Sequence, residues 1–147
     1  MRVLVRVVRD IAAGALALGL GSAPASAQWS QVAEIPATPL FSLFVNGDTV
    51  AAGADTTVQL SLDGGATWRH STQPVAGVRA ITAVRVMNGR LYAGTFGQGV
   101  FTSDDLGLGW QGFNQGLVGG FGDSQLDIDD LVPRGDTLYA ALSLIHI

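Results

Sequence analysis

The sequence predicts an all-β protein of short antiparallel strands, on three observations. Apolar runs alternate with turn-forming pairs, among them Asn46-Gly47, Asn88-Gly89 and Arg134-Gly135, which fall where a hairpin turn needs positive φ. Glycine supplies 20 of the 147 residues, which favours tight turns over long helices. From residue 28 onward, no stretch has a sustained helical period with start and stop signals.

The chain repeats itself at a spacing of 42 residues. The stretch SLDGGATW (61–68) returns as SDDLGLGW (103–110), and NGDTVAAG (46–53) returns as NGRLYAGT (88–95) at the same shift. The stretch RGDTLYAA (134–141) opens a third copy. Because two separate motifs agree on one shift, we interpret the sequence as that of a repeat protein.

Each copy is expected to form four strands. In the second copy these are residues 80–87, 90–96, 100–103 and 109–113, with the aspartate motif turning the chain between the third and the fourth. Four strands in 42 residues is the size of one β-propeller blade, which takes about 40 to 45 residues. The predicted fold is therefore a β-propeller of four-stranded blades with about two to three blades present, an incomplete ring because closed rings have ~4 to 8 blades.

The motif between the third and fourth strands has a physical role in the turn. Ser and Asp side chains accept hydrogen bonds from backbone amides that a tight turn leaves unpaired, and Gly takes a conformation that a β-carbon penalises. The Trp that follows is expected to start the outer strand and to bury its ring between neighbouring sheets. These positions hold Ser61, Asp63, Gly65, Thr67 and Trp68 in the first motif, and Ser103, Asp105, Gly107 and Trp110 in the second.

The pattern Ser/Thr-x-Asp-x-Gly-x-Thr-Trp closely resembles the Asp-box, or BNR repeat. The first motif matches it in full, and the second departs at Gly109, where Thr is usual, which should weaken that turn. The resemblance covers roughly residues 29–141 and implies the β-propeller of sialidases, sortilin-type receptors, xyloglucan-active glycoside hydrolases and photosystem II assembly factors. In those families the Asp-box is a structural turn at the blade periphery. The resemblance therefore implies that these residues stabilise hairpins and take no part in catalysis.

Residues 1–27 have the layout of a secretory signal peptide. Three arginines form a positive start, an apolar stretch runs from Ile11 to Ala23, and small residues precede the cleavage expected after Ala27. The alternative, a membrane anchor, needs ~20 mainly apolar residues, and this run is shorter and rich in Gly and Ala. We expect a secreted or periplasmic protein that keeps no membrane span.

Charge and cysteine content narrow the range of partners. Cleavage after residue 27 removes three Arg and Asp10 from the 8 basic and 12 acidic side chains. The mature part then has five basic and eleven acidic side chains, a net charge of −6, and no Lys. Such a surface repels phosphate backbones, which argues against a nucleic-acid partner. Because Cys is absent, the chain forms no disulfide and carries no lipid-modified Cys.

The acidic stretch DSQLDIDD leads into the first strand of the third copy. Its carboxylates belong to Asp123, Asp127, Asp129 and Asp130. Asp127 and Asp129 could reach one shared face of a strand. Two ligand roles are therefore possible for them: a pair of glycosidase carboxylates about 5 to 9 Å apart, or a Ca²⁺ site. The stretch lacks the Gly-spaced order of a calcium loop, and solvated acids at a strand entrance are commoner, which favours no ligand role.

Two functions remain. The first is a non-catalytic exported module that binds a protein or a glycan, and the alternative is a sialidase-like or glucan-active glycoside hydrolase whose catalytic residues lie in further blades. Sialidases resemble one another in a Phe/Tyr-Arg-Ile-Pro motif, and here Glu34 stands where that Arg grips the substrate carboxylate. Tyr92 and Tyr139 recur at equivalent positions, which indicates a packing slot rather than a nucleophile. No catalytic residue, cofactor or metal is assigned.

The third copy departs from the repeat after Ala141. The stretch LSLIHI (142–147) does not resemble the Gly-rich turn, third strand and aspartate motif that should follow. We expect Leu142 to Ile147 to be a sequencing artefact, and the chain to be the N-terminal part of a longer protein.

Overall fold

The computed structural model describes residues 32, 35, 39–74, 76–117 and 126–143. Within these ranges the chain forms antiparallel strands and no helix. The first sheet contains β1 (Ser42–Asn46), β2 (Thr49–Gly53), β3 (Val58–Ser61) and β4 (Arg69–His70). The second contains β5 (Ile81–Met87), β6 (Arg90–Thr95), β7 (Gly99–Ser103) and β8 (Gln111–Gly112). The third contains β9 (Ile128–Arg134) and β10 (Thr137–Leu142), so the all-β prediction is confirmed.

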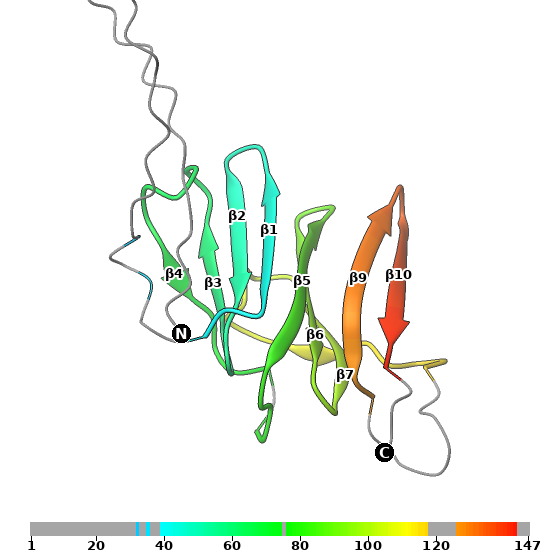
Figure 1. Cartoon of the computed structure of the whole chain (residues 1–147). Coiled ribbons are helices and arrows are strands. Elements are labelled where there is room, and N and C mark those ends of the chain that lie inside the picture. Colours follow the sequence, from blue (N-terminus) through cyan, green and yellow to red (C-terminus); the bar gives the residue numbers. More distant parts are fainter. Residues whose placement is uncertain (1–31, 33–34, 36–38, 75, 118–125, 144–147) are drawn as a thin grey trace, which may run out of the picture.

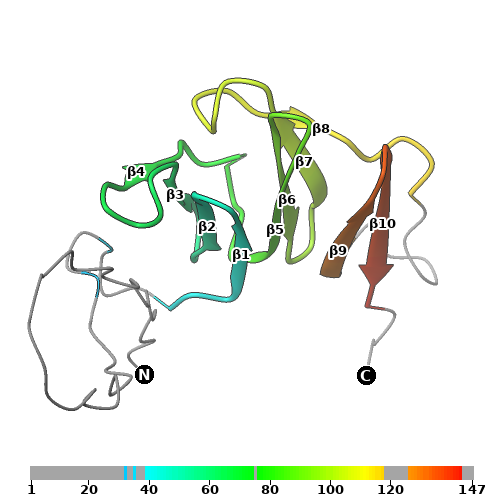
Figure 2. The same cartoon turned by 90° about the horizontal axis from the view of Figure 1, so that it is seen from above.

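The three sheets stand side by side in chain order. Neighbouring strands of the chain are neighbours in each sheet, and Figure 1 shows β1, β5 and β9 running in the same direction. Figure 2, seen from above, shows the second sheet between the other two, with β5 between β1 and β9. The contacts agree, because β5 touches both β1 and β9. Each sheet therefore packs a face against the next.

Two apolar cores separate the sheets. The core between the first and second sheets consists of Ala51, Val58, Leu60, Val78, Ile81, Val84, Leu91 and Ala93. The core between the second and third sheets consists of Ala83, Tyr92, Val100, Ile128 and Leu131. β5 contributes to both because successive side chains of a strand point to opposite faces. The middle sheet is thus covered on both faces.

A glycine at the fifth position of the second strand lets each following sheet approach closely. A Cβ on Gly53 would stand 2.5 Å from the carbonyl oxygen of Ile81, the first residue of β5. A Cβ on Gly94 would stand 2.5 Å from Cγ2 of Ile128, the first residue of β9. Both distances are too short for real atoms, so only Gly fits. The corresponding residue of β10 is Ala141.

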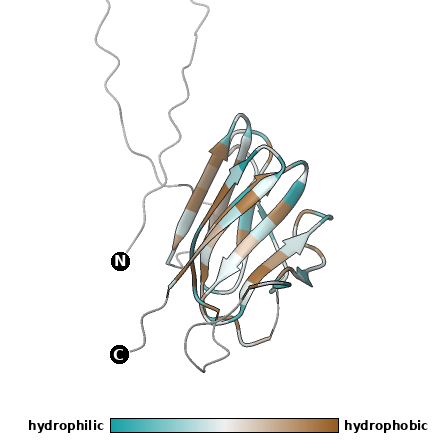
Figure 3. Cartoon of the chain, turned by 90° about the vertical axis from the view of Figure 1, so that its right-hand side faces the viewer, coloured by the Kyte–Doolittle hydropathy of each residue, from teal (hydrophilic) through white to brown (hydrophobic). Residues whose placement is uncertain are grey.

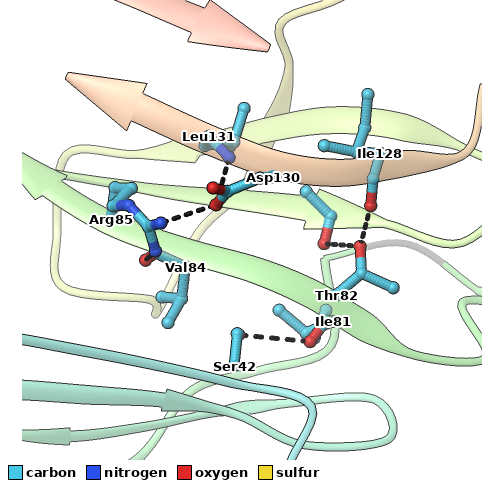
Figure 4. Close-up of polar contacts among 9 residues, drawn as sticks. Ser42, Ile81, Thr82, Val84, Arg85, Ile128, Asp130 and Leu131 are labelled. Atoms are coloured by element: carbon cyan, nitrogen blue, oxygen red, sulfur yellow. Dashed lines mark hydrogen bonds and ion pairs between the residues drawn. The ribbon is translucent and has the colours of Figure 1, made fainter. Parts of the chain in front are cut away.

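Polar contacts repeat across the same two interfaces (Figure 4). The Ser42 hydroxyl donates to the carbonyl of Ile81 at 3.4 Å, and the Thr82 hydroxyl donates to the carbonyl of Ile128. Arg85 on β5 also pairs with Asp130 on β9 at 2.6 Å. Hydroxyl groups at the start of one sheet thus satisfy carbonyls at the start of the next.

The hairpin turns differ from the sequence alignment by one residue. Asn88 and Gly89 form the β5–β6 turn, both with positive φ, as a type I′ turn requires. In the first and third sheets, however, Asn46 and Arg134 are the last residues of β1 and β9, and they pair with Thr49 and Thr137. The two-residue loops there begin at Gly47 and Gly135, whose φ values are +56° and +57°. In these two turns, positive φ is needed only at the Gly, and the preceding residue stays in its strand.

The strands of the second copy lie close to the predicted ranges, except the fourth. It was expected over residues 109–113 and covers only Gln111–Gly112. The amide of Gly109, the first residue of the expected strand, donates to the Asp105 carboxylate at 2.7 Å and does not join the ladder with β7. The turn motif thus shortens the outer strand.

Candidate functional site

The side chains of the first aspartate motif, residues 61–68, form hydrogen bonds within the turn between β3 and β4. The Ser61 hydroxyl accepts the amide of Gly65 and donates to Asp63 Oδ1, both at 2.8 Å. Asp63 accepts the amide and the hydroxyl of Thr67, at 2.8 and 2.6 Å. Gly65 has a φ of +88°, which a side chain would disfavour. The motif side chains are therefore engaged with the turn itself.

The second motif forms a similar turn with fewer side-chain donors. Ser103 accepts the amide of Gly107 and donates to Asp105 Oδ1, both at 2.8 Å. Gly109 offers only its amide to Asp105, where Thr67 offers an amide and a hydroxyl in the first turn. The second turn therefore has one hydroxyl donor fewer, as its departure from the pattern indicated.

The two Trp residues differ in what they contact. Trp110 is half-buried against the core between the first and second sheets, and its Nε1 donates to the carbonyl of Thr72 at 3.1 Å. Trp68 is half-buried but does not pack against either described core, and its Nε1 donates to Gly65 within its own turn at 3.2 Å. Of the two rings, Trp110 alone takes the expected place against the core between two described sheets.

The Asp63 carboxylate makes the first turn sensitive to acid. Hydrogen bonds from the Thr67 hydroxyl and amide, and then from Ser61, lower the pKa of Asp63 from 3.8 to about 2. Because the folded-state pKa is depressed, this group stabilises the fold above about pH 4, and the contribution is lost as the pH falls toward about 2. We expect Asp63→Asn to flatten the fall of the thermal midpoint between pH 4 and 2. A fall that is equally steep in Asp63→Asn and in the original chain would contradict the assignment.

A small hollow lies at the opposite end of the second sheet from the second aspartate motif, residues 103–110. It has a volume of about 190 Å³ and is lined by Gly77, Arg79, Phe96, Gly97 and Gln98. The first two belong to the connection between β4 and β5, and the other three form the turn between β6 and β7. The Phe96 amide donates to the carbonyl of Ala80 at 3.1 Å, which holds the turn beside the connection.

The lining of the hollow combines a cation, an amide and an aromatic ring. Phe96 is 46% exposed, although it is a large apolar side chain. Arg79 is exposed, and no described carboxylate forms an ion pair with it. These groups have room to contact a ligand by ring stacking and by charge-assisted hydrogen bonds.

Asp127 of the acidic stretch is held next to this hollow. The segment before it pairs with the β6–β7 turn, because the Gly99 amide donates to the carbonyl of Leu126 at 2.8 Å. Asp127 Oδ1 lies 3.8 Å from the place where a Cβ on Gly97 would stand. This oxygen is buried and accepts no hydrogen bond from the described residues. Asp127 therefore lies near the hollow, but this oxygen is not exposed to it.

The other acidic residues do not join Asp127. Asp130 pairs with Arg85 and also accepts the amide of Leu131 at 2.8 Å, whereas Asp129 is exposed on β9. Asp123 lies outside the described residues. Within the part of the chain that the structure describes, no three acidic or His side chains gather in a way that could hold a metal ion.

The positions compared with sialidases are also placed apart. Tyr92 is 6% exposed and packs its ring edge-on against Phe113, with 5.9 Å between ring centroids. Tyr139, at the matching position of β10, is 56% exposed. Glu34 lies outside the described residues. The two tyrosines thus share a position in their sheets, and the difference in exposure follows from the sheet that covers only Tyr92.

A second hollow, of about 340 Å³, lies near the β5–β6 turn. It is lined by Met87, Asn88, Gly89, Arg90, Tyr92 and Asp104. Arg90 forms two hydrogen bonds with Asp104, and this carboxylate raises the pKa of Arg90. The cation here is already paired, so this hollow offers a ligand less than the hollow at Arg79 does.

Comparisons with family models, with curated proteins and with solved structures found no match to this chain. The described residues contain no helix of the length and apolar character needed to cross a bilayer. The expected signal peptide and its cleavage position lie outside the described residues.

The hollow at Arg79 is not predicted by the sequence patterns. Its lining comes from two separate connections, one before β5 and one after β6, and neither carries a recognisable motif. The one signal in the sequence was Phe96, a large aromatic residue within a Gly-rich turn, where apolar side chains are uncommon.

Proposed function

We propose that this chain is part of an exported β-propeller that acts as a binding scaffold for a protein or a glycan. The observation that carries the proposal is the hollow at one end of the sheets, where Arg79, Phe96 and Gln98 are gathered. Functional residues commonly lie on loops that a rigid scaffold positions, and this arrangement fits that principle. The Asp-box residues serve the scaffold at the other end.

The propeller architecture is supported by the repeat and by the packing of the sheets. Two four-stranded antiparallel sheets follow each other at a spacing of 42 residues between Trp68 and Trp110. Each sheet packs a face against the next through its first strand, which is how blades follow one another around a propeller axis. Two Asp-box turns lie at matching ends of β3 and β7.

The hollow has the chemistry of a recognition site. Arg79 offers a charged donor, Gln98 an amide, and Phe96 an exposed ring. Asp127 lies close to Gly97 but is not among the lining residues, and its Oδ1 is buried. Sugars and peptide segments both present donors and acceptors next to apolar surface, so both fit this set. The volume of about 190 Å³ is below the ~300 to 1,000 Å³ of drug-sized pockets, which suits one group of a larger ligand.

The experiment is a binding screen followed by substitution. The purified chain is applied to an array of oligosaccharides and, in parallel, to an array of peptides. The dissociation constant of each hit is then measured by calorimetry for the original chain and for Arg79→Ala and Phe96→Ala. Each variant is expected to weaken binding about tenfold or more, because it removes a charge-assisted hydrogen bond or the stacking ring. The thermal midpoint should stay unchanged, since both side chains are exposed.

Leu108→Ala is the matched control. Leu108 is 70% exposed on the second Asp-box turn, at the far end of β7 from the hollow. Its replacement should leave the dissociation constant unchanged. Hits that bind equally well to all three variants would place the binding surface elsewhere and contradict this site.

A further inference from the structure

Gly directly follows Asn or Asp in three pairs, Asn46-Gly47, Asp63-Gly64 and Asn88-Gly89. At such a pair the backbone nitrogen of the Gly can attack the side-chain carbonyl carbon of the preceding residue, because Gly has no side chain to hinder the approach. The turns that hold the pairs lie at one end of the sheets, at the top of Figure 1, and Figure 3 shows this end from the side of the third sheet. The surroundings of the three pairs decide which of them reacts.

The Asp63 side chain is held in place and ionised. Its carboxylate accepts the amide and the hydroxyl of Thr67, at 2.8 and 2.6 Å, and the hydroxyl of Ser61 at 2.8 Å. These hydrogen bonds lower the pKa of Asp63 to about 2, so the group carries its charge at neutral pH. An ionised carboxylate is a poor target for a nucleophile, because its negative charge repels the attacking group. The first aspartate motif therefore protects the pair Asp63-Gly64.

Asn88 is restrained by its backbone conformation and by a hydrogen bond. Its φ of +52° lies in the left-handed region, where ψ is about +47°. With that ψ, the nitrogen of Gly89 is rotated about 170° away from Cβ of Asn88 around the Cα–C bond, whereas ring closure needs both on the same side. The Asn88 Nδ2 also donates to Asp136 Oδ1 at 3.2 Å. To react, Asn88 must leave both the turn conformation and this hydrogen bond.

Asn46 has neither restraint. It is exposed, it ends β1 opposite Thr49, and its side chain forms no hydrogen bond with another described residue. In an antiparallel strand ψ is about +135°, which places the next nitrogen about 105° from Cβ and so shortens the rotation to ring closure. No atom lies within 4 Å of the Cβ position of Gly47, so the ring has room to form. Of the three pairs, Asn46-Gly47 is the least hindered.

We propose that Asn46 is the site at which this chain deamidates, through a succinimide ring formed with Gly47. The Gly47 amide loses its proton and its nitrogen forms a bond to Cγ of Asn46. The Cγ–Nδ2 bond breaks, and ammonia leaves after taking up a proton. Water then opens the five-membered ring at either of its two carbonyl groups. The product at position 46 is aspartate or isoaspartate, and no atom is oxidised or reduced.

The product alters the contact between this turn and the first aspartate motif. The Gly64 amide donates to the carbonyl of Asp48 at 2.8 Å, which ties the β1–β2 turn to the β3–β4 turn. Isoaspartate lengthens the backbone by one methylene group just before this hydrogen bond. Either product also adds a negative charge close to Asp48, whose Oδ1 lies 3.7 Å from the place where a Cβ on Gly64 would stand. The modified turn is therefore expected to bind the motif less tightly.

The test is to incubate the folded chain in mildly alkaline buffer and to follow each pair by peptide mass spectrometry. Asn46 is expected to convert about tenfold or more faster than Asn88, which is the size of effect that one hydrogen bond to a charged group produces. The same incubation in concentrated urea is the matched control, because unfolding removes the turn and the contact with Asp136 and should bring the two rates together. In the folded chain, Asp136→Ala should raise the rate at Asn88 and leave the rate at Asn46 unchanged.

Asn46→Asp separates the longer backbone from the added charge, since this variant carries the charge alone. The isoaspartate form, isolated by chromatography, is expected to have a lower thermal midpoint than Asn46→Asp. Equal midpoints would overturn the effect on the aspartate motif. The proposal itself would be overturned by a folded chain in which Asn46 does not convert, by conversion at Asn88 or Asp63 that is as fast as at Asn46, or by a difference between the two Asn rates that persists in urea.

Discussion

Gly53→Ala is expected to lower the free energy of unfolding by about 3 kcal/mol, as overpacking of a close contact does. The added Cβ would stand 2.5 Å from the carbonyl oxygen of Ile81, and this backbone atom cannot move without shifting the start of β5. The hydroxyl of Ser42, which donates to the same carbonyl, lies in the same space. The effect is measured by urea unfolding followed by Trp fluorescence.

The third sheet supplies the control for this substitution. Ala141 occupies the position that corresponds to Gly53 and Gly94, and no sheet covers it in the described chain. Ala141→Gly should therefore change the free energy of unfolding by only about 0.5 to 1 kcal/mol, through backbone entropy. A loss for Gly53→Ala no larger than this would show that the first two sheets do not depend on the missing Cβ.

Gly107→Ala is expected to cost a similar amount, about 3 kcal/mol, because a strained backbone and a steric clash add. Gly107 has a φ of +91°, a conformation that costs other residues roughly 1 to 2 kcal/mol. Its added Cβ would also stand 2.5 Å from Cβ of Ser71, in the connection that leaves the first sheet. The Gly107 carbonyl accepts the amide of Thr72 at 2.8 Å, so a shift of this turn would loosen the contact between the two sheets.

Gly135→Ala separates the two causes. Gly135 has a φ of +57°, but no atom lies within 4 Å of its Cβ position. Its substitution therefore reports backbone strain without a steric clash, and about 1 to 2 kcal/mol is expected. Equal losses at Gly107 and Gly135 in the same urea titration would rule out a steric role for Ser71.

The strands could be predicted from the sequence because the patterns that indicate them involve only neighbouring residues. Alternating apolar runs and Gly-containing turns located β5, β6 and β7 to within about one residue at each end. The outer strand was predicted to begin too early because the amide of Gly109 donates to the Asp105 carboxylate and not to β7. A pattern of residue types does not reveal which acceptor an amide chooses.

The hollow at Arg79 could not be predicted from the sequence, because residues far apart in the chain form it. Arg79 and Phe96 belong to two separate connections, which the pairing of β5 with β6 brings together at one end of the second sheet. The sequence alignment also did not predict that Gly53 and Gly94 each lie close to the first strand of the next sheet. A shift of 42 residues aligns Gly53 with Thr95, whereas strand pairing places Gly53 with Gly94, opposite Ser42 and Ala83.

This one-residue offset has a consequence for how such a chain can be recombined. Relative to the 42-residue sequence alignment, the β1–β2 turn begins one residue later than the β5–β6 turn. Residues that are aligned in sequence therefore do not occupy the same position in the two sheets. A module swap that exchanges residues 46–53 for residues 88–95 would put Thr at position 53, where even a methyl group has no room beside Ile81. A segment that is duplicated or exchanged should therefore begin and end at equivalent positions of the backbone turns. These positions differ by one residue from the boundaries given by the sequence alignment.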